Sequence, residues 1–169
     1  GRDGNLILAR PLRLGGTPND PESPDLGHVG EVAEVDADMI MQFCSRRVIP
    51  VIAPLGVDHS GQAYNINADL VAAAVASSLA AEKLILLTDV AGVLDANGNL
   101  IPHLSEESAE KMIAGGAIKG GMIPKVHSAF EAIGQGVKKV HIIDGRVPHA
   151  VLLELFTDAG IGTEFVGRD

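Results

Sequence analysis

Apolar segments of strand length alternate with apolar segments of helix length through the middle of this sequence. Residues 83–88 form a continuous apolar run, which is typical of a strand buried on both faces of a parallel sheet. Residues 70–81, almost wholly Ala, Val, Leu and Ser, indicate a buried helix, and residues 48–54 indicate another buried strand. Strand, helix and strand in this order favour an α/β sandwich with a largely parallel sheet.

The flanking segments continue this alternation. Valines alternate with acidic residues over 30–36, which predicts an edge strand, and three further strands are expected at residues 5–9, 139–143 and 160–166. Four further helices are expected at 37–46 after the cap Asp36, at 105–114 after the cap Ser105, at 123–134, and at 148–156 with Pro148 in its first turn. Residues 11–27, rich in Pro, Gly and Asp, indicate an exposed loop. We expect a single domain over residues 1–169.

Composition excludes several classes of protein. A hydrophobic fraction of 46% with 21% charged residues predicts a globular, soluble chain. A net charge of -9, 3% aromatic residues and no Trp argue against nucleic acid as the main partner. The one cysteine, Cys44, is expected to be buried in a helix, and it allows no disulfide within the chain, which favours a reducing, cytoplasmic location. No apolar run approaches a membrane-spanning length and no signal peptide is visible.

A polar island, Asn65-Ile66-Asn67-Ala68-Asp69, lies where the apolar helix begins. In open α/β folds, ligands bind at the carboxyl ends of strands and at helix N-termini. Simple capping by Asn67 or Asp69 is the alternative, since a cap contributes about 1 kcal/mol. Three polar side chains within five positions favour a ligand site.

Two further segments could contact a nucleotide. After the strand at 83–88 the chain turns through Gly92, and Val90, Val93 and Leu94 could hold an adenine face while Asp89 makes polar contacts; an ordinary strand-exit turn is the alternative. Lys125 is expected in the first turn of a helix, beside Pro124 and paired glycines. A cation there faces the positive end of the helix dipole, which is unfavourable unless an anion binds at the same place. A solvated surface lysine is the alternative.

Other chemistries lack support in the sequence. No Walker sequence and no G-x-S-x-G elbow are present, and the six histidines show no metal-ligand spacing. We expect no dedicated metal site, and a divalent ion would arrive with nucleotide phosphates, as Mg²⁺ does.

Taken together, these segments resemble the acetylglutamate kinases of the amino acid kinase family. The similarity runs from about Gly1 to Gly167 and includes the polar island, residues 86–93, the run Gly120-Gly121-Met122-Ile123-Pro124-Lys125, and a hairpin-like Gly27-His28-Val29-Gly30-Glu31-Val32. The resemblance implies a three-layer α/β/α sandwich with an open, mainly parallel sheet. It also implies phosphoryl transfer from ATP, with Mg²⁺, to the side-chain carboxylate of N-acetyl-L-glutamate in arginine biosynthesis.

The resemblance also implies roles for individual residues. Asn65 and Asn67 would bind the acylated amino acid, Asp69 would orient catalytic lysines, and Lys125 would stabilise the transferring phosphoryl group. The nucleotide site would be lined by Asp89, Val90, Ala91, Gly92, Val93, Leu94, Ala117, Ile118 and Lys119.

The end of the chain resembles the arginine-inhibited members of this family. Asp144-Gly145-Arg146 is followed by four residues that would form an arginine effector site: His149, Glu154, Gly160 and Gly162. The Glu154 carboxylate could pair with a guanidinium, and a plain solvated helix face is the alternative for His149 and Glu154. The resemblance implies a homo-oligomer, a dimer or a hexamer, and residues 66–126 resemble cyanobacterial and plant versions, which permits control by the PII signal protein and a chloroplast location.

One departure from the family is large. The family's amino-terminal lobe has no counterpart in this sequence, which does not begin with Met and whose first four residues resemble a turn entering a strand. We therefore expect the nucleotide-binding lobe with part of the substrate site, inactive or nearly inactive by itself. Two alternatives stay open, namely a non-catalytic arginine- or nucleotide-sensing module and another amino acid kinase, such as glutamate 5-kinase or carbamate kinase.

Overall fold

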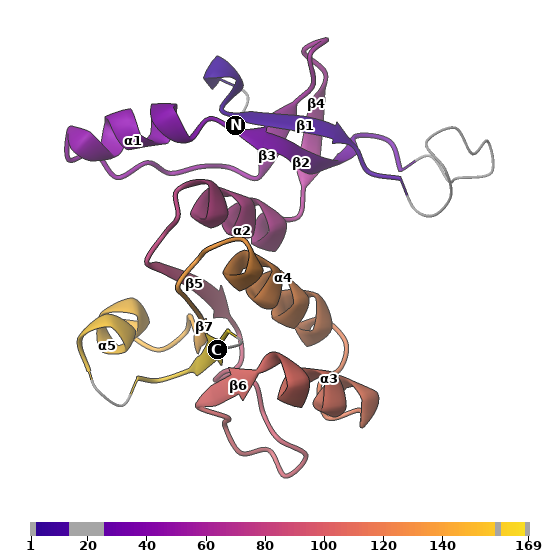
Figure 1. Ribbon diagram of the computed structural model, residues 1–169, viewed down its shortest axis with the longest axis vertical. Helices are drawn as coiled ribbons and strands as arrows, with labels where there is room; N and C mark the ends of the chain where they lie inside the picture. The colour runs from indigo at the N-terminus through magenta and orange to yellow at the C-terminus, as the bar shows by residue number, and fades with distance from the viewer. Residues whose placement is uncertain (1–2, 14–25, 158–159, 168–169) are drawn as a thin grey trace. The chain divides into compact units, whose positions relative to one another are not determined.

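The chain divides into two compact units, each with its own sheet. The computed structural model describes residues 3–13, 26–157 and 160–167, so the loop expected at 11–27 falls mostly outside the described residues, as do residues 1–2 of the N-terminal turn. Contacts group the chain into Gly1–Leu79 and Ala80–Asp169, called unit 1 and unit 2 below (Figure 1). We expected one domain over the whole chain; its assignment to a single nucleotide-binding lobe stays a prediction.

Unit 1 is built on four short strands whose pairings close on themselves in the order β1, β2, β4, β3. The pairs β1–β2 and β3–β4 are antiparallel, whereas β1–β3 and β2–β4 are parallel. The elements of unit 1 are η1 (Asp3–Asn5), β1 (Ile7–Pro11), β2 (Val29–Val35), α1 (Ala37–Ser45), β3 (Leu55–Val57), β4 (Ala63–Ile66) and α2 (Ala68–Ser78).

The core of unit 1 follows from side-chain alternation along its strands. Buried residues from β1, β4 and α2 form one cluster: Ile7, Ala9, Tyr64, Ile66 and Val71. Because successive strand residues point to opposite faces, the burial of Tyr64 and Ile66 leaves Asn65 exposed between them. Helix α1 begins as expected at the cap Asp36, whose Oδ1 accepts a hydrogen bond from the Met39 amide at 2.9 Å.

Three expectations for unit 1 are wrong. Residues 48–54 form no strand, and Ile49 and Val51 are 87% and 97% exposed, because Pro50 and Pro54 remove two ladder donors from this short run. The segment predicted as an edge strand, β2, pairs with a strand on each side and is therefore interior. Cys44 is exposed, since α1 buries only Ile40.

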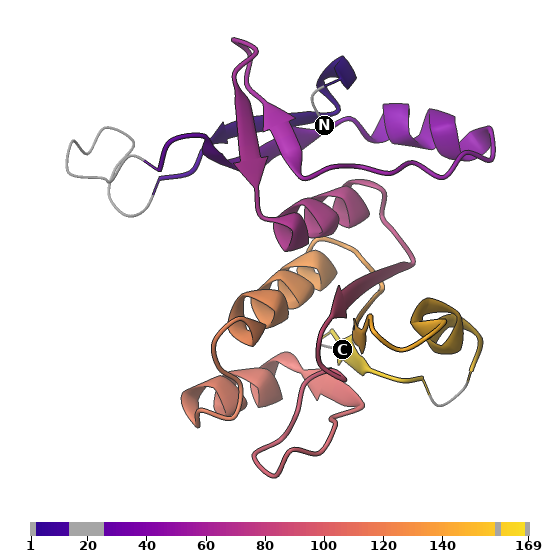
Figure 2. The same ribbon diagram turned by 180° about the vertical axis from the view of Figure 1, so that it is seen from behind.

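Unit 2 contains a four-stranded mixed sheet in the order β5, β7, β8, β6. The pairs β5–β7 and β6–β8 are parallel, and β7–β8 is antiparallel. The elements of unit 2 are β5 (Lys83–Thr88), β6 (His103–Ser105), α3 (Glu106–Ala114), α4 (Met122–Gly134), β7 (Lys139–Asp144), α5 (Ala150–Phe156) and β8 (Thr163–Val166). Both views show α3 and α4 side by side (Figures 1 and 2).

The core of unit 2 is formed where α4 covers β7 and β8. Val140, Ile142 and Ile143 of β7 are fully buried, and the Phe130 ring of α4 meets the Phe165 ring edge-on at a centroid distance of 5.1 Å. Helix α3 begins at Glu106, directly after the predicted cap Ser105, whose side chain accepts a hydrogen bond from the Ser108 amide.

Two expectations for unit 2 are wrong. Strand β5 is not buried on both faces, because the Leu87 side chain is 53% exposed. Helix α5 begins at Ala150 rather than Pro148. His149 adopts a left-handed conformation with φ 60°, so the helical conformation cannot extend back through it to Pro148. Both units nevertheless combine mixed sheets with helices, as an α/β chain should. No helix of the described residues has the length and apolar character needed to cross a membrane.

Candidate functional site

The polar island lies in unit 1, at the step from β4 to α2. Asn67 caps α2, because its Oδ1 accepts hydrogen bonds from the amides of Asp69 at 2.8 Å and Leu70 at 3.4 Å. Capping, the simpler interpretation of the island, is thus confirmed for Asn67. Its side-chain oxygen is engaged, whereas its substrate contact stays a prediction.

Asn65 and Asp69 are presented differently from Asn67. Asn65 is exposed on β4, and its backbone amide donates to the carbonyl of His28 at 2.8 Å. Asp69 is partly buried in the first turn of α2, where the positive end of the helix dipole favours a carboxylate. The two side chains therefore sit at the carboxyl end of one strand and the start of the next helix.

A close backbone approach supports this part of unit 1. A Cβ added at Gly30 would lie 2.6 Å from the Tyr64 Cβ and 2.9 Å from the Arg10 carbonyl oxygen. Only glycine lets β2 come this near to β4, which is a structural reason for glycine at position 30. Gly30 pairs with Ile66, directly beside the polar island.

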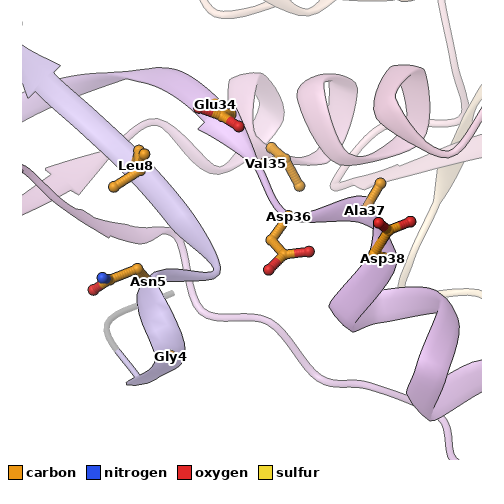
Figure 3. Close-up of a pocket in the computed structure, with 8 residues that line it drawn as sticks. All are labelled: Gly4, Asn5, Leu8, Glu34, Val35, Asp36, Ala37 and Asp38. Atoms are coloured by element: carbon orange, nitrogen blue, oxygen red, sulfur yellow. The ribbon is translucent and has the colours of Figure 1, made fainter.

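A cavity of about 520 Å³ in unit 1 is unsuited to an anionic substrate (Figure 3). Three of its lining residues are carboxylates, and Figure 3 shows Asp36 and Asp38 near the start of α1. One Asp36 oxygen already caps that helix. The residues that line the cavity are Gly4, Asn5, Leu8, Glu34, Val35, Asp36, Ala37 and Asp38. A phosphate or carboxylate would be repelled here, and none of the predicted site residues lines this cavity.

The predicted nucleotide turn follows β5 in unit 2. Asp89 and Ala91 are exposed and Val90 is half-buried, so these residues face outward. Val93 is 1% exposed, and its amide donates to the Thr163 hydroxyl at 2.8 Å. Its side chain therefore packs into unit 2 and does not offer the adenine face expected of it, whereas Leu94 is half-buried.

An ion pair lies beside this turn. The Arg146 guanidinium donates from Nε and Nη2 to the two Asp144 oxygens at 2.9 and 2.8 Å, a bidentate arrangement. These bonds lower the pKa of Asp144 to about 2. The pKa of Arg146 is raised mainly by Asp144, with a smaller contribution from Asp89. Arg146 therefore also interacts electrostatically with the carboxylate of the turn.

The Asp144–Arg146 pair predicts an acid-dependent loss of stability. The folded-state pKa of Asp144 lies below its ordinary value of 3.8, so the pair stabilises the fold above about pH 4 and ceases to do so as the pH falls toward 2. We expect the difference in free energy of unfolding between the native chain and Asp144→Asn to shrink over that window. Urea titrations at several pH values would measure it, and a difference independent of pH would contradict the assignment.

Lys125 lies on α4, as predicted, and is partly buried. The start of α4 has no side-chain cap, but the amides of Met122 and Ile123 donate to the carbonyls of Lys119 and Gly120 at 3.3 and 3.2 Å. These two amides are therefore engaged within the link, and an anion site beside Lys125 stays a prediction. Gly120 has φ +58°, which favours glycine at this point of the link.

The link before α4 contains the other predicted nucleotide residues. Ile118 is 3% exposed, so its side chain belongs to the core of unit 2. Ala117 is half-buried and Lys119 is exposed, which leaves these two able to contact a ligand.

The predicted effector residues converge on one pocket of unit 2, with a single exception. Glu154, Gly160 and Gly162 line a pocket of about 220 Å³, whereas His149 is not among its lining residues. We call this the β7–α5 pocket; its lining comprises Lys83, Pro102, His103, Lys139, His141, Glu154, Leu155, Thr157, Gly160, Gly162 and Glu164. A Cβ at Gly160 would lie 3.1 Å from Glu154 Oε2, so glycine there leaves room for the carboxylate.

His141 is the pocket residue that the sequence analysis missed. It is 4% exposed on β7, its Nδ1 lies within ion-pair distance of Glu154 Oε1 at 2.5 Å, and neither ring nitrogen makes a hydrogen bond of regular geometry among the described residues. The other Glu154 oxygen accepts the Ile161 amide at 2.8 Å. Burial holds the pKa of His141 below its usual value, although Glu154 opposes the shift. Glu154 is thus buried with a contact to each carboxylate oxygen, and the solvated helix face considered for it is wrong.

Charged residues surround this pair. Lys139 Nζ lies 2.8 Å from Glu164 Oε1, and His103 Nδ1 lies 3.6 Å from the other Glu164 oxygen. Glu164 raises the pKa of Lys139. The pocket therefore presents both signs of charge, as a zwitterionic ligand requires.

The predicted site residues fall into the two units as follows. Asn65, Asn67 and Asp69 belong to unit 1, and the remaining predicted site residues belong to unit 2. Asp69 lies in unit 1 and Lys125 in unit 2, and the orienting of Lys125 by Asp69 stays a prediction. No group of three His, Cys, Asp or Glu side chains able to hold a metal ion occurs in the part of the chain that the structure describes.

Comparison with known proteins yields acetylglutamate kinases as relatives. Acetylglutamate kinase of Acinetobacter baylyi is 55% identical over 170 residues, covering 99% of this chain and 56% of that protein. The chain thus spans about half the length of the curated relatives it matches. Among solved structures, N-acetylglutamate synthase from Neisseria gonorrhoeae, complexed with coenzyme A and L-arginine, is similar with a TM-score of 0.86 and 30% identity, over 96% of this chain and 37% of that one.

The fold is also found in a more distant enzyme. Carbamate kinase from Giardia lamblia bound to AMP-PNP has a TM-score of 0.62 at 17% identity, over 93% of this chain and 52% of that one, which is a likeness of fold alone. The sequence pattern of the amino acid kinase family matches residues 4–144, which is most of the chain. With the strand–helix order and the polar segments in agreement, the chain belongs to the amino acid kinase family.

Proposed function

We propose that this chain is part of an acetylglutamate kinase. The reaction transfers the γ-phosphoryl group of ATP to the side-chain carboxylate of N-acetyl-L-glutamate, giving N-acetylglutamyl 5-phosphate and ADP, as the second step of arginine biosynthesis. The observation that carries the proposal is 55% identity to an acetylglutamate kinase over 99% of this chain. The Asn65–Asp69 step and the turn after β5 supply local geometry suited to it.

The chemistry asks little of the protein beyond positioning and positive charge. A carboxylate acceptor is ionised at neutral pH, so the reaction needs no general base. The protein must hold the acceptor oxygen in line with the transferring phosphorus. It must also place positive charge next to the equatorial oxygens of the phosphoryl group. In this proposal Lys125 supplies charge, Asp69 orients lysines, and Asn65 and Asn67 contact the acceptor.

The nucleotide would bind at unit 2. Asp89, Val90, Ala91 and Leu94 offer an outward surface on the turn after β5, while Gly92 and Val93 fix that turn from within. Ala117 and Lys119 add a neighbouring surface, with Ile118 as their anchor in the core. Mg²⁺, held mainly by the phosphates, would offset their negative charge.

Several properties of the full-length protein belong to the same proposal. We propose the three-layer α/β/α sandwich with an open, mainly parallel sheet, a homo-oligomer that is a dimer or a hexamer, and a cytoplasmic location, or the chloroplast stroma in a photosynthetic eukaryote. Control by the PII signal protein is proposed as well. These proposals rest on resemblance and on the relatives.

Arginine is the proposed effector, and the β7–α5 pocket is its proposed site. Glu154 offers a buried carboxylate for a guanidinium, and a pocket of about 220 Å³ with charges of both signs suits an amino acid. His141 would adjust its contact with Glu154 when a cation binds, and its neutral form, favoured by burial, would avoid repulsion. His149, outside the lining, keeps only the support of the resemblance.

Replacing Glu154 by glutamine is expected to weaken arginine binding about 10- to 100-fold. The change keeps the size of the side chain and an oxygen for the Ile161 amide, but it removes the charge that a guanidinium would pair with. Isothermal titration calorimetry would measure the affinity. Glu107→Gln, a matched change on the exposed face of α3, should leave it unchanged. Equal affinity in the native chain and Glu154→Gln would contradict the assignment of the pocket.

The proposed reaction can be tested with a coupled acyl-phosphate assay of the full-length protein. We expect hydroxamate from N-acetylglutamate and ATP, and less of it when arginine is added. Turnover with glutamate or carbamate instead would favour another amino acid kinase. Binding of MgATP without turnover would favour the non-catalytic sensing module, for which the β7–α5 pocket is the supporting observation.

A further inference from the structure

Thr163 lies fully buried on β8, and its hydroxyl joins two segments that are distant in sequence. The hydroxyl donates to the carbonyl of Ile101 at 2.7 Å and accepts from the amide of Val93 at 2.8 Å. The Ile101 amide in turn donates to the Val93 carbonyl at 2.9 Å. The Thr163 side chain therefore links the two ends of the loop 93–101, which follows the proposed nucleotide turn.

The turn packs directly against this hydroxyl. Gly92 has φ +149°, and a Cβ there would lie 2.7 Å from Thr163 Oγ1 and 2.7 Å from Leu100 Cδ1. The backbone at Gly92 and Val93 is thus held by contact on one side and by a hydrogen bond on the other. Asp89, Val90 and Ala91 come just before these two residues, so Thr163 contacts the end of the turn that they begin.

We propose that Thr163 is a positioning residue that fixes the turn Asp89-Val90-Ala91-Gly92 for nucleotide binding. This inference rests on the proposed function, because it takes the turn as part of the ATP site. Thr163 does not touch the nucleotide. It acts by satisfying the buried Val93 amide, which has no solvent to replace the bond if the hydroxyl is lost.

The test compares variants that lose the hydroxyl with one that keeps it. Thr163→Val keeps the shape and removes the hydroxyl, and Thr163→Ser keeps the hydroxyl. We expect Thr163→Val to weaken MgATP binding about tenfold, measured by calorimetry, and Thr163→Ser to restore it to within about twofold. In the full-length protein the KM for ATP should rise while the KM for N-acetylglutamate stays unchanged, a split that a general loss of stability would not produce.

Two controls keep the test decisive. Ser78→Ala removes an exposed hydroxyl that donates to the Ala74 carbonyl, outside the proposed sites, and should leave MgATP binding unchanged. If Thr163→Val does not fold, Thr163→Ala and Thr163→Ser give the same comparison, because both shorten the side chain and only one keeps the hydroxyl. Hydrogen exchange at the Val93 amide should be faster in the variants that lack the hydroxyl.

The outcomes separate this inference from the proposed function. Equal MgATP binding by the native protein and by folded variants lacking the hydroxyl would overturn the positioning role and leave the proposed site intact. Absence of MgATP binding by the native protein would overturn the nucleotide site itself, and the inference with it. Weakened binding that serine rescues would support both.

Discussion

Replacing Lys125 by alanine is expected to lower kcat about 10²- to 10³-fold in the full-length protein, with a smaller change in the KM for ATP. The ammonium is proposed to act on charge that is greatest in the transition state, and one such donor contributes roughly this factor. Coupled assays at saturating ATP and N-acetylglutamate would measure kcat. Native-like thermal unfolding of the variant would show that the loss is one of chemistry.

A matched lysine provides the control. Lys111 lies on α3 and pairs with Glu107 at 2.6 Å across one helical turn, with both side chains largely exposed. Lys111→Ala should change kcat by less than about twofold, since an exposed pair of this kind is worth little. An unchanged kcat in Lys125→Ala would remove Lys125 from the proposed mechanism.

Replacing Gly162 by alanine is expected to cost about 3 kcal/mol of folding free energy. The added Cβ would meet the Ile142 carbonyl oxygen and lie 2.5 Å from Ile143 Cγ2, so β7 backbone would have to move. Overpacking against backbone lies at the upper end of such penalties. Thermal unfolding should show a fall in Tm of roughly 6–12 °C for a chain of this size.

Gly134 is the natural control for this substitution. It ends α4, and a Cβ there would meet no atom within 4 Å. Gly134→Ala should be neutral or stabilising by up to about 1 kcal/mol, because alanine is the better helix former. A Gly162→Ala variant as stable as Gly134→Ala would mean that β7 and β8 can separate at little cost.

Local signals in the sequence were sufficient for three of the helix starts. Asp36, Asn67 and Ser105 were each placed at or near a helix start from residue type and position, and each accepts the expected amide bond. Such caps depend on neighbours two or three residues away, which a sequence displays directly. The parallel pairing of β5 with β7 likewise agrees with the strand–helix–strand order.

Apolar runs were a weaker guide. The run at 48–54 looked like a buried strand, but its two prolines outweighed its hydrophobicity, and Ile49 and Val51 are exposed. The usual burial of free cysteine also predicted a buried Cys44, whereas α1 buries only Ile40. Apolar composition indicates where a chain can be buried, and packing partners decide where it is.

Contacts between distant residues could not be predicted from the sequence. His141 sits in an apolar strand with no polar neighbour to mark it, and its partner Glu154 comes from the next helix. The Thr163 hydroxyl bonds residues 70 and 62 positions away. Only the folded sheet brings these groups together, so the His141–Glu154 contact and the support of the proposed nucleotide turn emerged from the structure.

The exposed thiol on α1 has a practical consequence. Cys44 is the one cysteine of the sequence, and there is no Trp to contribute background fluorescence. In oxidising buffers this thiol can link two copies through an intermolecular disulfide, so oligomer measurements need a reductant. The same thiol accepts a single maleimide dye, which would mark unit 1 at one defined position for fluorescence measurements.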